Sequence, residues 1–290
     1  MTDHDLPVLR FGHSPDPDDA FMFYGFSTGA VTVEGPGAAG EGRRYRVEHL
    51  LEDIQSLNER AMGGELEITA ISAHAYPYVA DKYVVMRTGV SMGDGYGPLI
   101  VTRKEASLES LRGARIAIPG LMTTASLALK FHLDAYKPVV TPFDQILESV
   151  RDGKVDAGVV IHEGQLTFDR DGLYKVADLG QLWKQETGLP LPLGLDVVRR
   201  DLGADLGVAC SRALRASIEY AMANREAAMR YALDYGRGLD MPLGDRFVGM
   251  YVNDWTLDMG EKGRLALTTL LDRAADQGWV PRLNEDLMLV

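Results

Sequence analysis

Short apolar runs alternate with segments of helical periodicity over most of the chain. Short apolar runs are typical of buried strands, and apolar residues three or four positions apart are typical of helices. The predicted strands are 8–12, 45–50, 67–71, 83–87, 98–103, 114–119, 139–140 and 155–161. The predicted helices are 18–24, 51–63, 123–135, 143–151, 204–223, 225–234 and 263–275, with Asn224 as the cap of the helix 225–234. Strands that alternate with helices in this way predict an α/β fold.

The order of these elements divides the chain into two lobes. The alternation starts again near Leu108 and closes near Gly188, after which the chain continues mainly as helices. We therefore predict a first lobe of residues 1–99 and 193–290 and an inserted second lobe of residues 100–192. Each lobe is expected to be a mostly parallel sheet flanked by helices. Two lobes joined by two crossing segments are expected to close on a small ligand in the cleft between them.

His162 is the first candidate for catalysis. It follows the apolar run from Val155 to Ile161, which is typical of a strand buried on both faces. Open parallel sheets bind ligands at the carboxyl ends of their strands, where His162 would lie. Histidine exchanges protons near neutral pH, which favours a general base, although a hydrogen-bonded structural histidine is the commoner role at such a position. Glu163 is not expected to orient the imidazole, because adjacent side chains on a strand point to opposite faces.

Other strand ends are predicted to face the same cleft. Ser14 follows the first predicted strand, and Ser72 follows the third. Thr123 and Thr124 open a helix directly after another strand. The backbone N–H groups and the positive dipole at the start of that helix suit a carboxylate or a phosphate, with the two hydroxyls as further donors. An ordinary helix cap is the simpler interpretation of the two threonines.

Composition and charge exclude several classes of partner and site. The 290 residues are 46% hydrophobic and 25% charged, as is usual for a folded globular protein. The net charge of −12 repels phosphate backbones and anionic membrane surfaces, so we expect neither nucleic acid nor a membrane as a partner. The single cysteine, Cys210, provides neither a disulfide framework nor a thiolate metal site. Neither a signal peptide nor a membrane span is evident, which predicts a cytoplasmic protein.

Several motifs together resemble one enzyme family. They are Ser14 to Phe23, Thr123 to Ala125, Ile161 to Glu163, Thr187 to Gly194 and Tyr251 to Asn253. In this order, over most of its length, the chain resembles the 1,4-dihydroxy-6-naphthoate synthases of the menaquinone pathway that proceeds through futalosine. The resemblance implies the two-lobed fold of type II periplasmic binding proteins. It also implies a lyase that converts cyclic dehypoxanthinylfutalosine to 1,4-dihydroxy-6-naphthoate with loss of the sugar-derived fragment.

The resemblance implies roles for individual residues as well. His162 matches the histidine that these enzymes use as proton acceptor. Substrate contacts are expected at Ser14, Asp18, Ala70, Ile71, Ser72, Thr123, Thr124 and Asn253. The naphthoate skeleton bears a carboxylate, for which the helix start at Thr123 is a suitable seat. Typical relatives have cysteine and asparagine in place of Asp16 and Asp18, and lysine in place of Ala70, so the local charge of this chain is more negative.

The expected reaction needs neither a metal nor a redox cofactor. Neutral His162 would remove a proton from the sugar-derived portion, and formation of the aromatic naphthalene system would drive fragmentation. We expect Asp16, Asp18 and Asp19 to serve as helix caps and contacts for substrate hydroxyls rather than as magnesium ligands, because no further ligands are identifiable. Two alternatives stay open at this point: a solute-binding protein that holds a small carboxylate without chemistry, and the related chorismate dehydratase.

Overall fold

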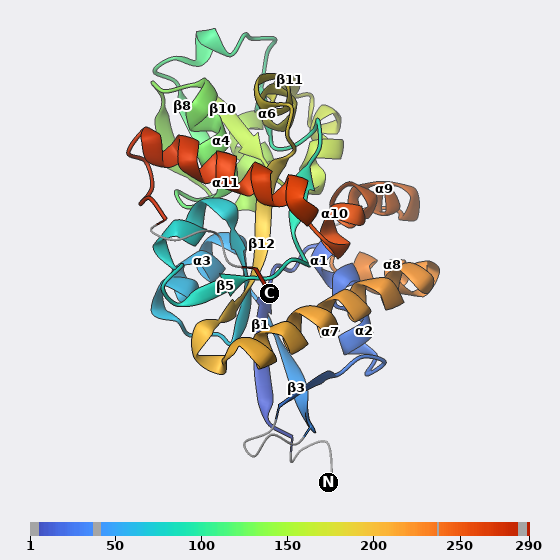
Figure 1. The fold of residues 1–290 in the computed structure, drawn as a ribbon. Helices are drawn as coiled ribbons and strands as arrows, with labels where there is room; N and C mark the ends of the chain where they lie inside the picture. The colour runs from blue at the N-terminus through green and yellow to red at the C-terminus, as the bar shows by residue number, and fades with distance from the viewer. Residues whose placement is uncertain (1–5, 37–41, 237, 284–288) are drawn as a thin grey trace. The chain divides into compact units, whose positions relative to one another are not determined.

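The chain folds into two compact units, which consist of residues Met1–Ser91 with Gly194–Val290 and of residues Met92–Leu193. The computed structural model describes residues 6–36, 42–236, 238–283 and 289–290 (Figure 1). Each unit is built around a sheet of its own with flanking helices, which confirms the predicted α/β class.

The sheet of the first unit has the strand order β2-β3-β1-β4-β12-β5. Its strands are β1 (Val8–His13), β2 (Val33–Pro36), β3 (Gly42–Leu51), β4 (Ile68–Ser72), β5 (Tyr83–Val85) and β12 (Leu191–Arg199), and a short strand β6 (Ser91–Gly93) follows β5 along the chain. β1 runs parallel to β3 and β4, whereas β12 runs antiparallel to both β4 and β5. The carboxyl ends of β1 and β4 therefore lie at the same edge of the sheet.

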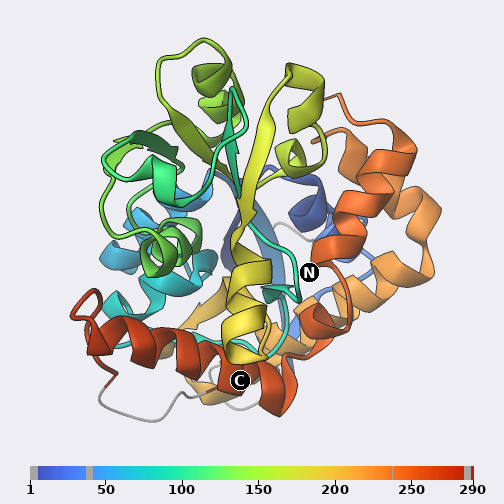
Figure 2. The same cartoon turned by 90° about the horizontal axis from the view of Figure 1, so that it is seen from above.

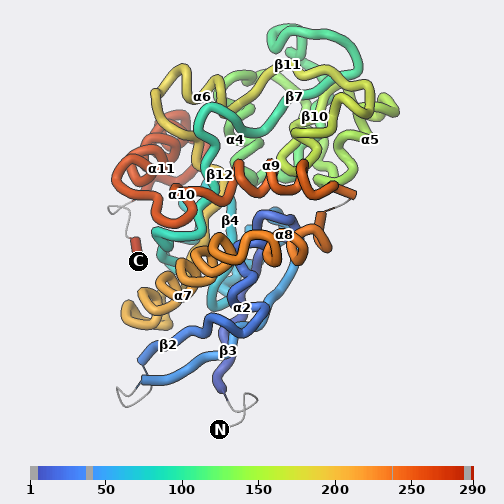
Figure 3. Tube along the Cα trace, turned by 90° about the vertical axis from the view of Figure 1, so that its right-hand side faces the viewer, coloured from blue at the N-terminus to red at the C-terminus, as the bar shows by residue number. Residues whose placement is uncertain are grey.

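Helices cover this sheet and bury its apolar side chains. They are α1 (Pro17–Met22), α2 (Tyr24–Ser27), α3 (Ile54–Gly63), α7 (Ala204–Ala223), α8 (Arg225–Leu233), α9 (Met241–Tyr251), α10 (Asp254–Leu257) and α11 (Gly260–Asp276, red in Figure 2). Figure 3 shows α2 and α7 next to one another beside β2, α8 contacts α1 and α7, and α3 contacts β4. Within the described residues, every helix is too short or too polar to span a bilayer.

Close packing between β1 and α3 depends on a glycine. A Cβ atom at Gly12 would come within 2.8 Å of the Leu57 side chain and 2.5 Å of the Leu66 side chain, which is closer than van der Waals contact permits. On the other face of β1, Phe11 joins a core that includes Phe21 of α1 and Leu214 of α7. Burial of such side chains is the main favourable contribution to folding.

The second unit contains a mixed sheet with the strand order β11-β7-β10-β8-β9. Its strands are β7 (Leu99–Thr102), β8 (Arg115–Ile118), β9 (Lys137–Val140), β10 (Ala157–Val160) and β11 (Tyr174–Asp178). Its helices are α4 (Thr124–His132), α5 (Ile146–Arg151) and α6 (Leu179–Thr187). Only β7 runs against its neighbours, while β10, β8 and β9 are parallel to one another. The sheet is therefore mostly parallel, as predicted.

Two details of the helix predictions need correction. The helices α6 and α9 were not predicted, because their apolar residues are interrupted by glycines and prolines. Asn224 does not cap α8 through its side chain. Its amide Nδ2 instead donates a hydrogen bond of 2.9 Å to the carbonyl oxygen of Tyr220, at the end of the preceding helix α7. Asn224 is the single residue between α7 and α8. Its side chain bonds a free carbonyl at the end of α7 rather than a free N–H at the start of α8.

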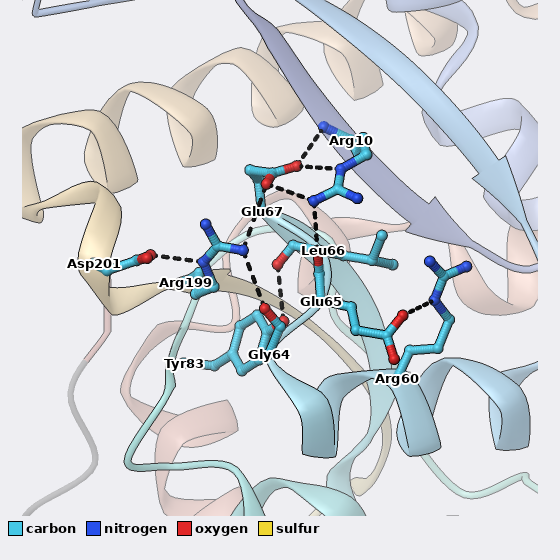
Figure 4. Close-up of polar contacts among 9 residues, drawn as sticks. All are labelled: Arg10, Arg60, Gly64, Glu65, Leu66, Glu67, Tyr83, Arg199 and Asp201. Atoms are coloured by element: carbon cyan, nitrogen blue, oxygen red, sulfur yellow. Dashed lines mark hydrogen bonds and ion pairs between the residues drawn. The ribbon is translucent and has the colours of Figure 1, made fainter.

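Ion pairs close the edge of the first sheet at which β4 begins (Figure 4). Glu67 accepts hydrogen bonds of 2.9 Å from Nε and from Nη2 of Arg10, and its Oε1 lies 3.5 Å from Nη1 of Arg199. Arg199 also donates to Asp201 at 2.7 Å. Burial works to raise the pKa of Glu67, but the hydrogen bonds and the charge of Arg10 outweigh it, so the pKa is lowered. Every charge in this cluster of Arg10, Glu67, Arg199 and Asp201 has a partner.

Candidate active site

His162 lies just beyond β10 and begins a 3-10 turn that spans Glu163–Leu166. Its side chain is buried, with 6% of the residue exposed. Nε2 lies 2.8 Å from the backbone oxygen of Phe143, which can only accept a hydrogen bond, so Nε2 carries a proton. The backbone N–H of Gly164 donates to Nδ1 at 3.1 Å. Together the two contacts select the neutral Nε2–H tautomer, whose basic lone pair is on Nδ1.

Glu163 lies close to this basic nitrogen, contrary to the prediction from strand alternation. Its Oε2 atom is 3.3 Å from Nδ1 of His162, and both side chains are buried. The prediction was wrong because β10 ends at Val160, so His162 and Glu163 belong to a turn in which neighbouring side chains can meet. A carboxylate at this distance stabilises an imidazolium that has taken a second proton on Nδ1.

The threonines after β8 lie at the same edge of the second sheet as His162. β8 lies between β10 and β9, and all three strands are parallel. Phe143 follows β9 and His162 follows β10, so the hydrogen bond between them spans the edge at which β8 ends. The turn that carries Thr123 begins there. The second unit therefore brings its three predicted site residues to one sheet edge.

The two threonine hydroxyls are bonded within the protein. Thr123 caps α4, since its Oγ1 accepts the N–H of Ser126 at 3.3 Å and donates to the carbonyl oxygen of Gly120 at 2.8 Å. Thr124 donates to the carbonyl oxygen of Leu193 at 2.7 Å. Both threonines are buried. Any anion at this helix start would be held chiefly by the backbone N–H groups of the first turn.

Ser14 is fixed by two aspartates of the loop after β1. Its backbone N–H donates to Oδ2 of Asp19 at 2.7 Å, and its hydroxyl donates to Oδ2 of Asp16 at 3.0 Å. Asp16 occupies the N-cap position of α1 but makes no side-chain cap bond. The predicted capping by Asp16 is therefore wrong, because its carboxylate is turned towards Ser14 instead.

Asp18 and Asp19 have unusual proton affinities. Burial raises the pKa of Asp18 well above its ordinary value, and the charges of Asp19 and Asp16 raise it further. Burial also raises the pKa of Asp19, to about 6, against the opposing effect of the hydrogen bonds from Ser14. These carboxyl groups therefore exchange protons much closer to neutral pH than an exposed aspartate does.

The end of β4 is anchored by a residue that the sequence analysis missed. Asn58 of α3 donates from Nδ2 to the Ser72 hydroxyl at 3.1 Å and accepts the Ser72 N–H at 2.8 Å. The only available signal was an asparagine on the buried face of a predicted helix. Ile71 is fully buried, which leaves its backbone alone for ligand contact, whereas Ala70 is partly exposed.

Asn253 has a structural role in this unit. Its Oδ1 accepts the N–H of Trp255 at 3.0 Å, and its Nδ2 donates to the carbonyl oxygen of Met250 at 2.9 Å. Its backbone N–H donates to the Thr256 hydroxyl, which completes a capping box at α10. This capping accounts for an asparagine at this position without a ligand.

A histidine pair lies beside the Ser14 loop. Nε2 of His13 is 3.1 Å from Nδ1 of His49, and the His13 ring stacks on Phe23. Burial and the neighbouring His49 lower the pKa of His13 to about 3. His13 is therefore neutral at physiological pH. Within the described residues, no three His, Cys, Asp or Glu side chains are arranged to hold a metal ion.

Comparison with known proteins establishes the family. A family model described as menaquinone biosynthesis matches residues 9–276. The chain belongs to this family. A 1,4-dihydroxy-6-naphtoate synthase of Thermus thermophilus is 40% identical over 94% of this chain and 96% of its own. One of Streptomyces coelicolor is 39% identical over 97% of this chain and 98% of its own. The resemblance found in the sequence motifs is thus confirmed.

Solved structures confirm the fold. A crystal structure of an Archaeoglobus fulgidus protein is 45% identical, covers 94% of this chain and 98% of its own, and has a TM-score of 0.86. A Candida albicans protein described as having the generic periplasmic binding protein fold has a TM-score of 0.64 at 13% identity, with 97% of this chain and 92% of its own covered. The second likeness concerns the fold alone.

Proposed function

We propose that this chain is a 1,4-dihydroxy-6-naphthoate synthase, which converts cyclic dehypoxanthinylfutalosine to 1,4-dihydroxy-6-naphthoate and releases the sugar-derived fragment. The observation that carries the proposal is the nearly full-length identity of about 40% to two such synthases. The small carboxylate substrate and the cytoplasmic location expected from the sequence are part of this proposal.

In the proposed reaction His162 is the proton acceptor. Its Nε2–H is fixed by the Phe143 carbonyl, so Nδ1 is the nitrogen that takes the proton from the substrate. The proton arrives where the Gly164 N–H now donates, and the substrate must therefore replace this hydrogen bond of 3.1 Å. Once protonated, the imidazolium is stabilised by Glu163. The electron pair left on the substrate then drives fragmentation towards the aromatic product.

The remaining predicted residues would bind the substrate. The helix start at Thr123 and Thr124 is proposed to hold the naphthoate carboxylate through backbone N–H groups. In the first unit, Ser14, Asp18 and the strand end at Ala70 to Ser72 are proposed to contact the sugar-derived portion. Asn253 is also proposed to contact the substrate, with its side chain held by the capping contacts at α10.

Product analysis by mass spectrometry tests this function. Purified protein is incubated with cyclic dehypoxanthinylfutalosine, next to the variants His162→Gln and His132→Gln. Glutamine can keep a hydrogen bond but cannot act as a base, so we expect His162→Gln to lose roughly 10²- to 10⁴-fold in kcat. His132 is the last residue of α4, at the opposite end of this helix from Thr123. The matched variant His132→Gln is therefore expected to retain turnover.

The alternatives predict different products. Release of the compound unchanged by the wild-type protein, under conditions in which an established synthase works, would indicate a binding protein. Water loss from chorismate would indicate the dehydratase. Full activity of His162→Gln would contradict the role of proton acceptor while leaving the synthase function in place.

A further inference from the structure

Asp196 of β12 is a buried carboxyl group that no step above uses. It is 1% exposed, and neither of its side-chain oxygens has a hydrogen-bond partner among the described residues. A carboxyl group without partners in a protein interior is costly, and native proteins rarely keep one without a reason. The residues around Asp196 indicate why the protein keeps this carboxyl group.

The fold provides a fitted place for this carboxyl group. Oδ2 lies against the backbone of Gly89, where a Cβ atom would be only 2.0 Å away. Gly89 has a φ of +82°, which favours glycine independently of that contact. Leu214 of α7 packs against the same glycine. Any larger residue at position 89 would displace Asp196, so the backbone leaves room for this group.

The residue opposite Asp196 in the first unit is small and partly exposed. Asp196 is directly opposite Ala70 in the antiparallel pair of β12 and β4. Residues directly opposite in such a pair project from the same face, with Cβ atoms about 5 Å apart. Ala70 is partly exposed, and two residues further along β4 lies Ser72, at the strand end of the candidate site. A ligand group seated over the small Ala70 side chain would therefore lie next to Asp196.

Asp19 of α1 influences Asp196 electrostatically. The charge of Asp19 acts on Asp196 and, together with its burial, raises the pKa of Asp196 well above the ordinary value. Among the described residues, no lysine or arginine forms an ion pair with Asp18, Asp19 or Asp196. The arrangement repels anions, and the described side chains provide no metal site. What it lacks is a neutral partner that donates hydrogen bonds.

We propose that Asp196 forms a hydroxyl-binding subsite that holds a hydroxyl group of the sugar-derived portion of the substrate. A protonated carboxyl group both donates and accepts hydrogen bonds, and a hydroxyl group does the same. An ammonium or guanidinium group could only donate. This inference rests on the proposed function, because that function supplies the hydroxyl-bearing ligand.

Steady-state kinetics of Asp196→Val and Asp196→Asn test the subsite. Valine fits the strand but removes both oxygens, so we expect KM to rise about tenfold or more with kcat nearly unchanged, as one hydrogen bond to a buried polar group is lost. Asparagine keeps one acceptor and is expected to give a smaller rise. Asp201→Asn, an exposed aspartate near the other end of β12, is the matched control and should leave KM unchanged.

A substrate analogue that lacks one sugar-derived hydroxyl makes the test specific. The wild type should bind this deoxy analogue about tenfold more weakly than the substrate, whereas Asp196→Val should bind both equally. An unchanged KM in Asp196→Val, or equal discrimination by both proteins, would overturn the subsite while turnover by the wild type upheld the synthase. Failure of the wild type to form 1,4-dihydroxy-6-naphthoate would instead overturn the proposed function, and the subsite as stated with it.

Discussion

Two carboxyl groups beside the neighbouring strands β4 and β12 of the first unit differ in their partners. Glu67 lies at the start of β4, which we call the paired end, and Asp196 lies nearer the carboxyl end of β4, which we call the unpaired end. At the beginning of β4, Glu67 is held by Arg10 and Arg199 (Figure 4). On β12, only three residues before Arg199, Asp196 has no hydrogen-bond partner among the described residues. The same sheet can therefore satisfy an acidic side chain fully or leave it unsatisfied. Because its carboxyl group has no hydrogen-bond partner among the described residues, the unpaired end is the one to examine for ligand binding.

The largest expected effect comes from breaking the paired end. Glu67→Ala removes the common partner of Arg10 and Arg199, so that Arg10 loses its ion-pair partner and Arg199 keeps only Asp201. We expect a loss of about 2 kcal/mol in the free energy of unfolding, because hydrogen bonds to charged groups are lost. Urea unfolding measures this loss, and KM for the substrate should not change. An altered KM with unchanged stability would show that the paired end, too, belongs to a binding site.

A smaller effect is expected from a carboxylate in the second unit. Glu163→Gln removes the charge next to Nδ1 of His162 but keeps the size of the side chain. We expect kcat to fall about tenfold, equal to about 1.4 kcal/mol of transition-state stabilisation, because the imidazolium loses its counter-charge. Loss of a nearby anion lowers the pKa of a histidine. The acidic limb of the profile of kcat against pH is therefore expected to move to lower pH in this variant.

Rapid kinetics of Glu163→Gln over a pH series provide the measurement. Glu163→Asp, which retains the charge, serves as the matched control and should recover part of the activity. A purely structural role for Glu163 would reduce activity in both variants without moving the pH profile.

A third prediction concerns the pH dependence of stability at the unpaired end. The pKa of Asp196 is raised in the folded protein, so the folded state binds more protons than the unfolded state as pH rises above about 4. Its contribution to stability is therefore fully present below that pH and is lost as pH rises towards the folded pKa. Asp196→Val is expected to be more stable than the wild type by about 1 kcal/mol at pH 8 and to gain less at pH 5.

Thermal unfolding of both proteins at a series of pH values measures this difference. Asp19, with a pKa of about 6, adds a change in the same direction, whereas His13, with a pKa of about 3, acts in the opposite direction. His13 is present in both proteins, so the difference between the two unfolding curves reflects chiefly Asp196 and its coupling to Asp19. A wild type that is more stable than Asp196→Val at pH 8 would show that the carboxyl group is satisfied in the protein.

The smallest effect is expected from giving Asp196 a partner. Ala70→Lys places an ammonium group on the residue directly opposite Asp196, as on the paired end of the sheet. We expect a gain of about 0.5 kcal/mol in stability from the cross-strand pair. Ala70→Met, of similar length without charge, is the control for steric blocking. Equal stability of the two variants would contradict an ion pair with Asp196.

The sequence predicted that His162, Thr123 and Thr124 lie at the ends of strands, because the signals for strand and helix ends come from adjacent residues. His162 ends an apolar run, and Thr123 and Thr124 open a helix. Such patterns of neighbouring residues predict where the strands of a parallel sheet end. Asn58 and Asp196 were missed because their roles depend on residues far away in the chain. The hydrogen bonds of Asn58 are made to Ser72, and the burial of Asp196 depends on Gly89 and on α7.

The amino-acid sequence by itself determined the α/β class, the family and the identity of the candidate base, because periodicity and motifs are properties of adjacent residues. Only the tertiary structure decided how the candidate groups are bonded. It selected the tautomer of His162 through the carbonyl of Phe143, brought Glu163 to Nδ1 and left Asp196 without a partner among the described residues. The physical reason is that hydrogen bonding and burial depend on which strands and turns meet in space, which no local pattern specifies.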